Sequence, residues 1–171
     1  MKNLILFLFT ALVLSCSASV FAQAKTSLEY MQEGNVHFIN GDFKLAIPPY
    51  EKALELEKNK RRLKRDVWIA LVEKLGTAHA NTRDFKSAFA VLEYGTTVEP
   101  THPVFYYNIA CGHGELGDED NAIKYLRLAY KNKANMPPGK RFPDPMRDTP
   151  FENFADSEKF KTAVAEMKNG Q

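Results

Sequence analysis

An internal repeat constrains the fold of this 171-residue sequence more than any other feature. Three segments of fourteen residues, starting at Gly34, Gly76 and Ala110, align without gaps. The alignment brings a histidine, an aspartate and an alanine into phase in every segment. These residues are His37, His79 and His113, then Asp42, Asp84 and Asp118, then Ala46, Ala88 and Ala122. Successive histidines are 42 and 34 residues apart, which indicates one supersecondary unit that is copied and stacked.

Each unit predicts two helices around a tight turn. Gly41 and Gly117 suit the left-handed residue that ends a helix, and the aspartate after each of them is a good cap for the next helix. Arg83 replaces this glycine in the second unit. The small residues in phase let the two helices approach closely, while aromatic and leucine residues at spacings of three and four fill the remaining space.

The 34-residue period, with its small residues and turns in phase, resembles the tetratricopeptide repeat. The resemblance implies an all-α fold, a right-handed stack of three helical hairpins over residues 27–60, 69–102 and 103–133. Residues 134–150 are predicted to form a loop because they are rich in proline. Residues 151–171 predict a C-terminal helix that caps the stack, with Asp156 as its N-cap. Its apolar face consists of Phe160, Ala163, Val164 and Met167.

Two features depart from a regular repeat. Pro48 and Pro49 lie inside the predicted second helix, which is therefore expected to start late, with Pro48 in its first turn, or to be kinked there. The first two units are also separated by eight extra residues, which include a run from Lys58 to Arg65 with six cations. This run predicts helix extensions or a short loop, and it offers a possible contact with an anionic surface. The formal net charge of +2 by itself implies no polyanionic partner.

The first 22 residues predict a signal peptide. Lys2 precedes a short apolar run from Leu4 to Leu14, and Val20-Phe21-Ala22 offers a cleavage site after Ala22. The expected location is therefore the periplasm or the outside of the cell. The alternative is an outer-membrane lipoprotein, because Val13-Leu14-Ser15-Cys16 resembles a lipoprotein box with Cys16 as the lipidated residue.

Little in the sequence indicates catalysis or a cofactor. It contains no nucleophile elbow, zinc-protease motif or phosphate-binding loop. The three equivalent histidines should be too far apart along a stack to share one metal ion, so they are interpreted as packing residues, and no metal site is predicted. Cys111 is likewise expected to pack in an apolar helix, and His102 to cap a helix or face solvent. No cofactor is predicted.

In tetratricopeptide proteins the first helix of each hairpin lines a concave groove, and the resemblance assigns that role to residues of this chain. The predicted partner-binding residues are Met31, Asn35, Phe38, Glu73, Thr77, Tyr107 and Cys111. No lysine or arginine is expected among the groove residues, so a clamp on a terminal carboxylate is not predicted. Phe38, Met31 and Tyr107 are expected to anchor a partner.

The sequence thus favours a non-catalytic interaction module of the bacterial cell envelope, with a protein or peptide partner. Nucleic acid is not an expected partner, and membrane contact is expected only if Cys16 is lipidated. Two alternatives stay open: a lipid-anchored accessory subunit of an envelope assembly, and a hydrolase whose residues converge only in three dimensions.

Overall fold

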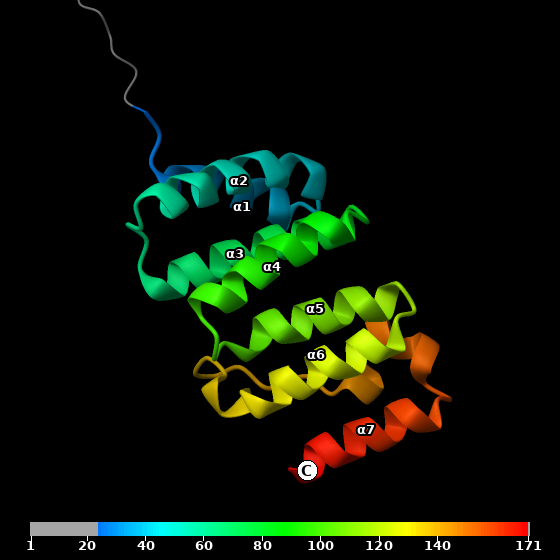
Figure 1. The fold of residues 1–171 in the computed structure, drawn as a ribbon. Helices are drawn as coiled ribbons and strands as arrows, with labels where there is room; N and C mark the ends of the chain where they lie inside the picture. Colours follow the sequence, from blue (N-terminus) through cyan, green and yellow to red (C-terminus); the bar gives the residue numbers. More distant parts are fainter. Residues whose placement is uncertain (1–23, 171) are drawn as a thin grey trace, which may run out of the picture.

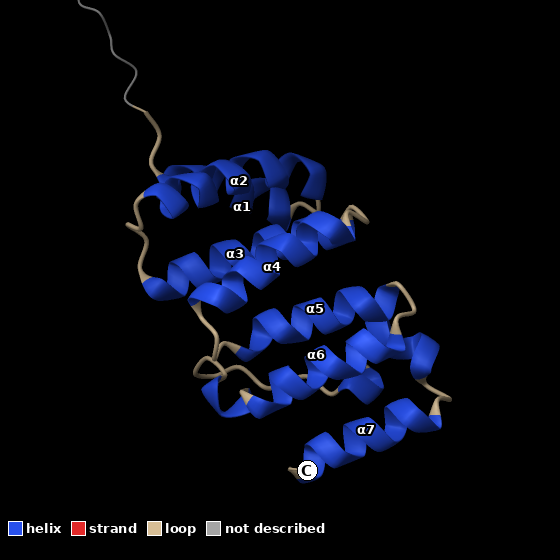
Figure 2. Cartoon of the chain, viewed as in Figure 1, coloured by secondary structure: helices blue, strands red, loops and turns tan. Residues whose placement is uncertain are grey.

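The chain folds into a stack of helical hairpins, in a computed structural model that describes residues 24–170. The hairpins are α1 and α2 (Ser27–Ile39 and Phe43–Asn59), α3 and α4 (Arg65–Asn81 and Phe85–Val98), and α5 and α6 (Pro103–Glu115 and Glu119–Lys131). Within the described range there is no β-strand (Figures 1 and 2). The predicted all-α hairpin stack is confirmed.

Residues after the third hairpin form three short 3₁₀ helices and one α-helix. They are η1 (Lys133–Asn135), η2 (Pro145–Arg147), η3 (Thr149–Phe154) and α7 (Glu158–Asn169). The four predicted apolar residues of α7 are all buried, and α7 packs against α6. The predicted cap at Asp156 is wrong: Ser157 is the N-cap, because its side chain accepts a hydrogen bond from the backbone N–H of Phe160.

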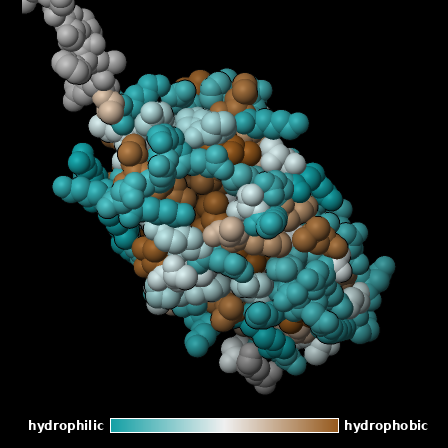
Figure 3. Space-filling model, turned by 45° about the horizontal axis from the view of Figure 1, so that its top comes forward, coloured by the Kyte–Doolittle hydropathy of each residue, from teal (hydrophilic) through white to brown (hydrophobic). Residues whose placement is uncertain are grey.

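Two apolar clusters hold the stack together. The first joins the first two hairpins to α5, and the second joins α5 and α6 to η3 and α7. Close approach depends on the small residues, since Ala46, Ala88 and Ala122 are buried. A Cβ atom on Gly34 would lie 2.5 Å from the ring of Tyr50. Apolar side chains still reach part of the surface, where hydrophilic ones surround them (Figure 3).

Helix α2 contains both prolines in its interior. It begins at Phe43, so the predicted late start, with Pro48 in the first turn, is wrong. The two prolines leave the backbone carbonyls of Lys44 and Leu45 without their usual helical donors. Both of these residues are exposed, so water can reach the carbonyls and the helix continues through the prolines.

The second hairpin makes its turn without glycine. Arg83 adopts the left-handed conformation at φ 65°, where the other hairpins have Gly41 at φ 79° and Gly117 at φ 72°. Side chains of Asp84 and Asp118 cap the following helices, as predicted, but Asp42 makes no side-chain cap hydrogen bond. The second turn therefore carries a backbone strain that the others lack.

Relief of this strain gives a direct stability test. The Arg83→Gly variant is expected to be about 1 kcal/mol more stable than Arg83→Ala, because glycine adopts the left-handed conformation without a Cβ clash. Both variants lose the same arginine side chain, so their difference isolates the backbone. Urea denaturation followed by circular dichroism measures it, and equal stability of the two variants would contradict the assignment of the turn.

The predicted leader and the lipidation site at Cys16 lie outside the described residues. Among the described helices, none is both long enough and apolar enough to cross a membrane.

Candidate functional site: a cleft between the second and third hairpins

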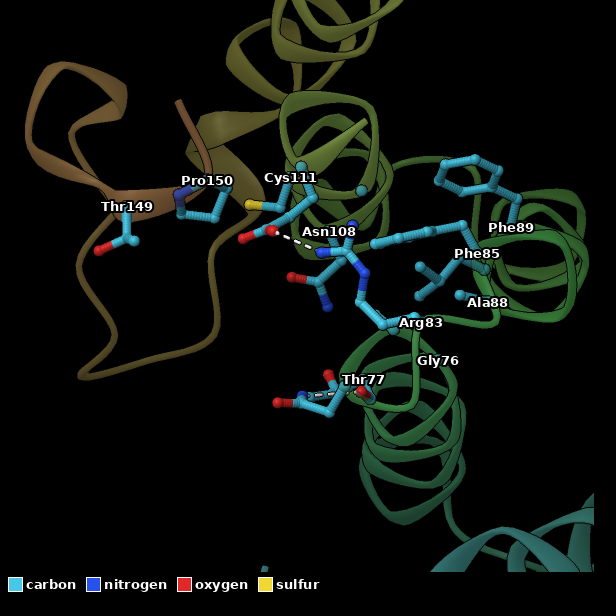
Figure 4. A pocket seen from close by; sticks show the side chains of 15 residues that line it. Gly76, Thr77, Arg83, Phe85, Ala88, Phe89, Asn108, Cys111, Thr149 and Pro150 are labelled. Carbon is cyan, nitrogen blue, oxygen red and sulfur yellow. Dashed lines mark hydrogen bonds and ion pairs between the residues drawn. The ribbon is translucent and has the colours of Figure 1, made fainter. Parts of the chain in front are cut away.

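A cleft of about 500 Å³ opens between the second hairpin and α5. Helix α3 supplies one wall through Gly76, Thr77 and Ala80, and α5 supplies another through Asn108 and Cys111 (Figure 4). Apolar residues of α4 form part of the lining: Phe85, Ala88, Phe89 and Leu92. Thr149 and Pro150, from η3, close one side. This volume falls within the range of ordinary ligand sites.

The polar groups around the cleft differ in how fully they are engaged. Arg83 Nη1 lies 3.2 Å from Glu115 Oε2, so these two charges compensate each other. The Asn81 side chain donates to the carbonyl oxygen of Thr77 at 2.9 Å. The half-buried Asn108 carboxamide has no hydrogen-bond partner among the described residues. One donor–acceptor group is therefore available in a cleft with apolar lining.

The family model of the tetratricopeptide repeat matches residues 30–60 and 104–136, which correspond to the first and third hairpins. The chain contains tetratricopeptide repeats. Such repeats generally act as protein–protein interaction scaffolds and are typically non-catalytic. None of the curated proteins matches the chain.

The groove face of the third tetratricopeptide hairpin is covered by the chain itself. The Tyr107 hydroxyl donates to Asp148 Oδ2 at 2.7 Å, and its ring packs edge-on against Phe142 and Phe151. A Cβ atom on Gly114 would lie 2.3 Å from the backbone oxygen of Pro150. Tyr107 is only 5% exposed, so its prediction as an open anchor for a partner is wrong.

Burial also changes the chemistry of this face. The pKa of the Tyr107 hydroxyl is raised by burial and by its hydrogen bond to Asp148. Burial likewise raises the pKa of the Cys111 thiol, and the carboxylates of Asp148 and Glu115 act in the same direction. The thiol of Cys111 therefore stays protonated near neutral pH, which makes it a weak nucleophile.

The first hairpin uses its predicted groove residues largely for internal contacts. Met31 is buried, so it too is wrong as an exposed anchor. Asn35 Oδ1 accepts hydrogen bonds from the Tyr50 hydroxyl at 2.9 Å and from Lys74 Nζ at 2.5 Å. Phe38 is half-buried against Phe43 and Tyr50, outside the lining of the cleft.

Two expectations about charged groups also need correction. His102 neither caps α5 through its side chain nor faces solvent; it is buried and its Nε2 lies 2.7 Å from Glu73 Oε1. Glu73 is thus engaged inside the stack. Cations do occur near the groove, since Arg83 lines the cleft and the long side chain of Lys74 reaches Asn35 on α1.

Of the predicted site residues, Thr77 and Cys111 line the cleft. Sequence reasoning missed Asn108, Arg83 and the two phenylalanines of α4. Asn108 carried a usable signal, because it is a lone carboxamide in the apolar stretch from Val104 to Cys111. Arg83 carried another, because it replaces the turn glycine of the other repeats.

The three equivalent histidines pack separately. His113 stacks on Phe89 with a centroid distance of 4.5 Å, and its Nδ1 lies 3.1 Å from Asp118. Within the described residues, the Nδ1 atom of the buried His79 has no hydrogen-bond partner, and Asp84 Oδ2 lies 3.5 Å from it. Among the described residues there is no group of three or more potential ligands that could hold a metal ion.

The packing interpretation of His79 makes a prediction. His79→Phe is expected to change the free energy of unfolding by less than about 1 kcal/mol, because it removes an unpaired buried polar atom and keeps an aromatic ring. Thermal melts with zinc and with a chelator should coincide for both proteins. Melting that depends on metal in the native chain and not in the variant would contradict the interpretation.

Proposed function

We propose that the chain is a non-catalytic interaction module of the bacterial cell envelope, which binds an extended peptide segment of a partner protein in this cleft. The observation that carries the proposal is the unpartnered carboxamide of Asn108 beside the apolar lining from α4. A carboxamide can both donate and accept hydrogen bonds, so it can pair with the N–H and C=O groups of an extended peptide.

The remaining lining fits the same ligand. Phe85, Phe89 and Leu92 offer an apolar surface to a side chain of the peptide. Arg83 and Glu115 neutralise each other, so the cleft has no isolated charge from this pair to select a charged terminus. Binding should therefore depend weakly on salt, which screens mainly exposed charge contacts. The raised pKa of Cys111 supports binding rather than nucleophilic chemistry at the site.

The envelope location rests on the sequence of the first 22 residues. The preferred form is a chain cleaved after Ala22. The alternative is an accessory subunit of an envelope assembly that is anchored by a lipid on Cys16. Intact-mass measurement of the exported protein distinguishes the two forms, and a chain that still begins at Met1 would contradict both.

A library of displayed peptides tests the binding site. Peptides selected on the native chain should bind at least about 30-fold more weakly to Ala80→Trp, because an indole at this lining position fills the cleft. Asn108→Ala should weaken the binding of the same peptides, since it removes the hydrogen-bond donor and acceptor of the carboxamide. Fluorescence anisotropy measures both affinities.

The matched control is Ala90→Trp, which adds the same side chain at an exposed position of α4 outside the cleft lining. It should leave peptide affinity unchanged. If both tryptophan variants bind like the native chain, or both lose binding equally, the cleft is not the site. Far-ultraviolet circular dichroism confirms that both variants keep their helices.

A further inference from the structure

The two edges of the hairpin stack carry opposite charge. In Figure 1 the connections from α2 to α3, from α4 to α5 and after α6 lie at one edge, and the hairpin turns lie at the other. We call residues 57–65, 99–102 and 131–141 the basic edge; they include ten lysines and arginines and two carboxylates. The turns at 40–43, 82–85 and 115–120 include six carboxylates and one arginine. The chain therefore has a small net charge but a strongly uneven distribution of charge between the two edges.

Helix capping explains the acidic turns but not the whole basic edge. Carboxylates stabilise helix N-termini, and the turns precede the N-termini of α2, α4 and α6. Lys64 and Arg65, however, occupy the N-cap and the first position of α3, where positive charge opposes the helix dipole. Lys64 makes no cap hydrogen bond. Helix capping therefore does not account for the positive charge of Lys64 and Arg65.

The cations between Lys60 and Arg65 differ in whether they already form an ion pair within the stack. Arg61 and Arg65 both pair with Glu99, at 3.2 and 2.8 Å. Lys60, Arg62 and Lys64 are exposed, and none of them forms an ion pair within the described part of the chain. The basic edge thus presents a cluster of uncompensated positive charge to the outside.

The loop formed by residues 60–64, which we call the basic loop, is held next to the start of α1. Buried Glu57 accepts hydrogen bonds from the Ser27 hydroxyl at 2.5 Å, and from the backbone N–H groups of Arg62 and Leu63 at 2.9 and 3.0 Å. One carboxylate therefore ties the start of α1 to the basic loop. Cys16, the possible lipidation site, precedes Ser27 by eleven residues in the sequence.

We propose that the basic edge is a membrane-facing surface that binds the anionic headgroups of a phospholipid bilayer. Its charge spreads over three successive connections, which suits a broad surface rather than a narrow ligand. Helix α1 starts at this edge, so in the form anchored by a lipid on Cys16 the bilayer that holds the lipid lies next to the cations. Asn81, Arg83 and Glu115 place the peptide cleft toward the acidic edge, so this inference is independent of the proposed peptide binding.

Vesicle flotation with the exported protein tests the proposal. Binding to vesicles that contain phosphatidylglycerol should exceed binding to pure phosphatidylcholine by at least about tenfold at low salt, and this preference should shrink as salt rises. A lipid on Cys16 would bind both kinds of vesicle, so the ratio between them reports the contribution of charge. In the triple variant K60E/R62E/K64E, the preference for anionic vesicles should be at least about tenfold smaller than in the native chain.

The matched control is K44E/K86E/K124E, which makes the same change in net charge at three exposed lysines outside the basic edge. It should keep most of the preference for anionic vesicles. The proposal fails if the basic-edge variant binds like the native chain, or if the control loses as much as the variant does. It also fails if soluble polyphosphate binds the basic edge while anionic vesicles show no preference.

Discussion

Replacing Trp68 by alanine is expected to lower the free energy of unfolding by about 3–5 kcal/mol, one of the two largest effects that the structure predicts. Trp68 is 1% exposed, and its ring packs edge-on against Tyr94 of the same hairpin and Phe105 of the next one. Loss of the indole removes the contact that joins the second and third hairpins on this side. Urea denaturation followed by circular dichroism measures the change.

The control for Trp68 is another large apolar residue that the structure leaves in solvent. Ile39 is 79% exposed, so Ile39→Ala should change the free energy of unfolding by less than about 0.5 kcal/mol. Similar losses in the two variants would contradict the described packing of Trp68 between the second and third hairpins.

Phe151→Ala should produce an effect of similar size, about 3–5 kcal/mol, for a different reason. Phe151 is 2% exposed and packs against Phe160 of α7 and Tyr107 of α5. It attaches the proline-rich segment to the groove face of the third hairpin, and its neighbour Pro150 forms part of the cleft. The variant should therefore also weaken peptide binding, although residue 151 itself does not line the cleft.

The control lies in the same segment. Met146 is 40% exposed, so Met146→Ala should affect stability by less than about 0.5 kcal/mol and leave peptide affinity unchanged. If Phe151→Ala unfolds no more easily than Met146→Ala, then the segment does not cover the third hairpin as described.

The hairpins could be predicted because their determinants are local. The turn at Gly117-Asp118 and the small residue Ala122 lie within one repeat, and their order is the same in the first repeat. Helical period, turn chemistry and capping all act over fewer than about ten residues. A repeated pattern of this kind specifies both the unit and its stacking.

The cleft could not be predicted in the same way, because its shape depends on contacts between distant residues. Tyr107 occupies a groove position in its own hairpin, but Asp148 lies 41 residues later and covers it. The proline-rich composition of that segment indicated a loop without indicating where the loop packs. Its phenylalanines, Phe142 and Phe151, show in retrospect that it required an apolar surface.

Arg83 shows a second limit of sequence reasoning. A missing turn glycine suggests a weaker turn, whereas in the structure the left-handed backbone persists and the side chain reaches Glu115 on α5. Spacing alone cannot show which long side chain crosses a groove. For the same reason Lys74 was not expected beside Asn35.

The most direct test of the account is the position of a bound peptide on the protein. Amide chemical shifts of the chain should be recorded as a selected peptide is added. Binding in the cleft should change the shifts of the residues that line it, with Thr77, Asn108 and Thr149 among them. Changes confined to the opposite depression between α2 and α4, around Leu54 and Val91, would contradict it.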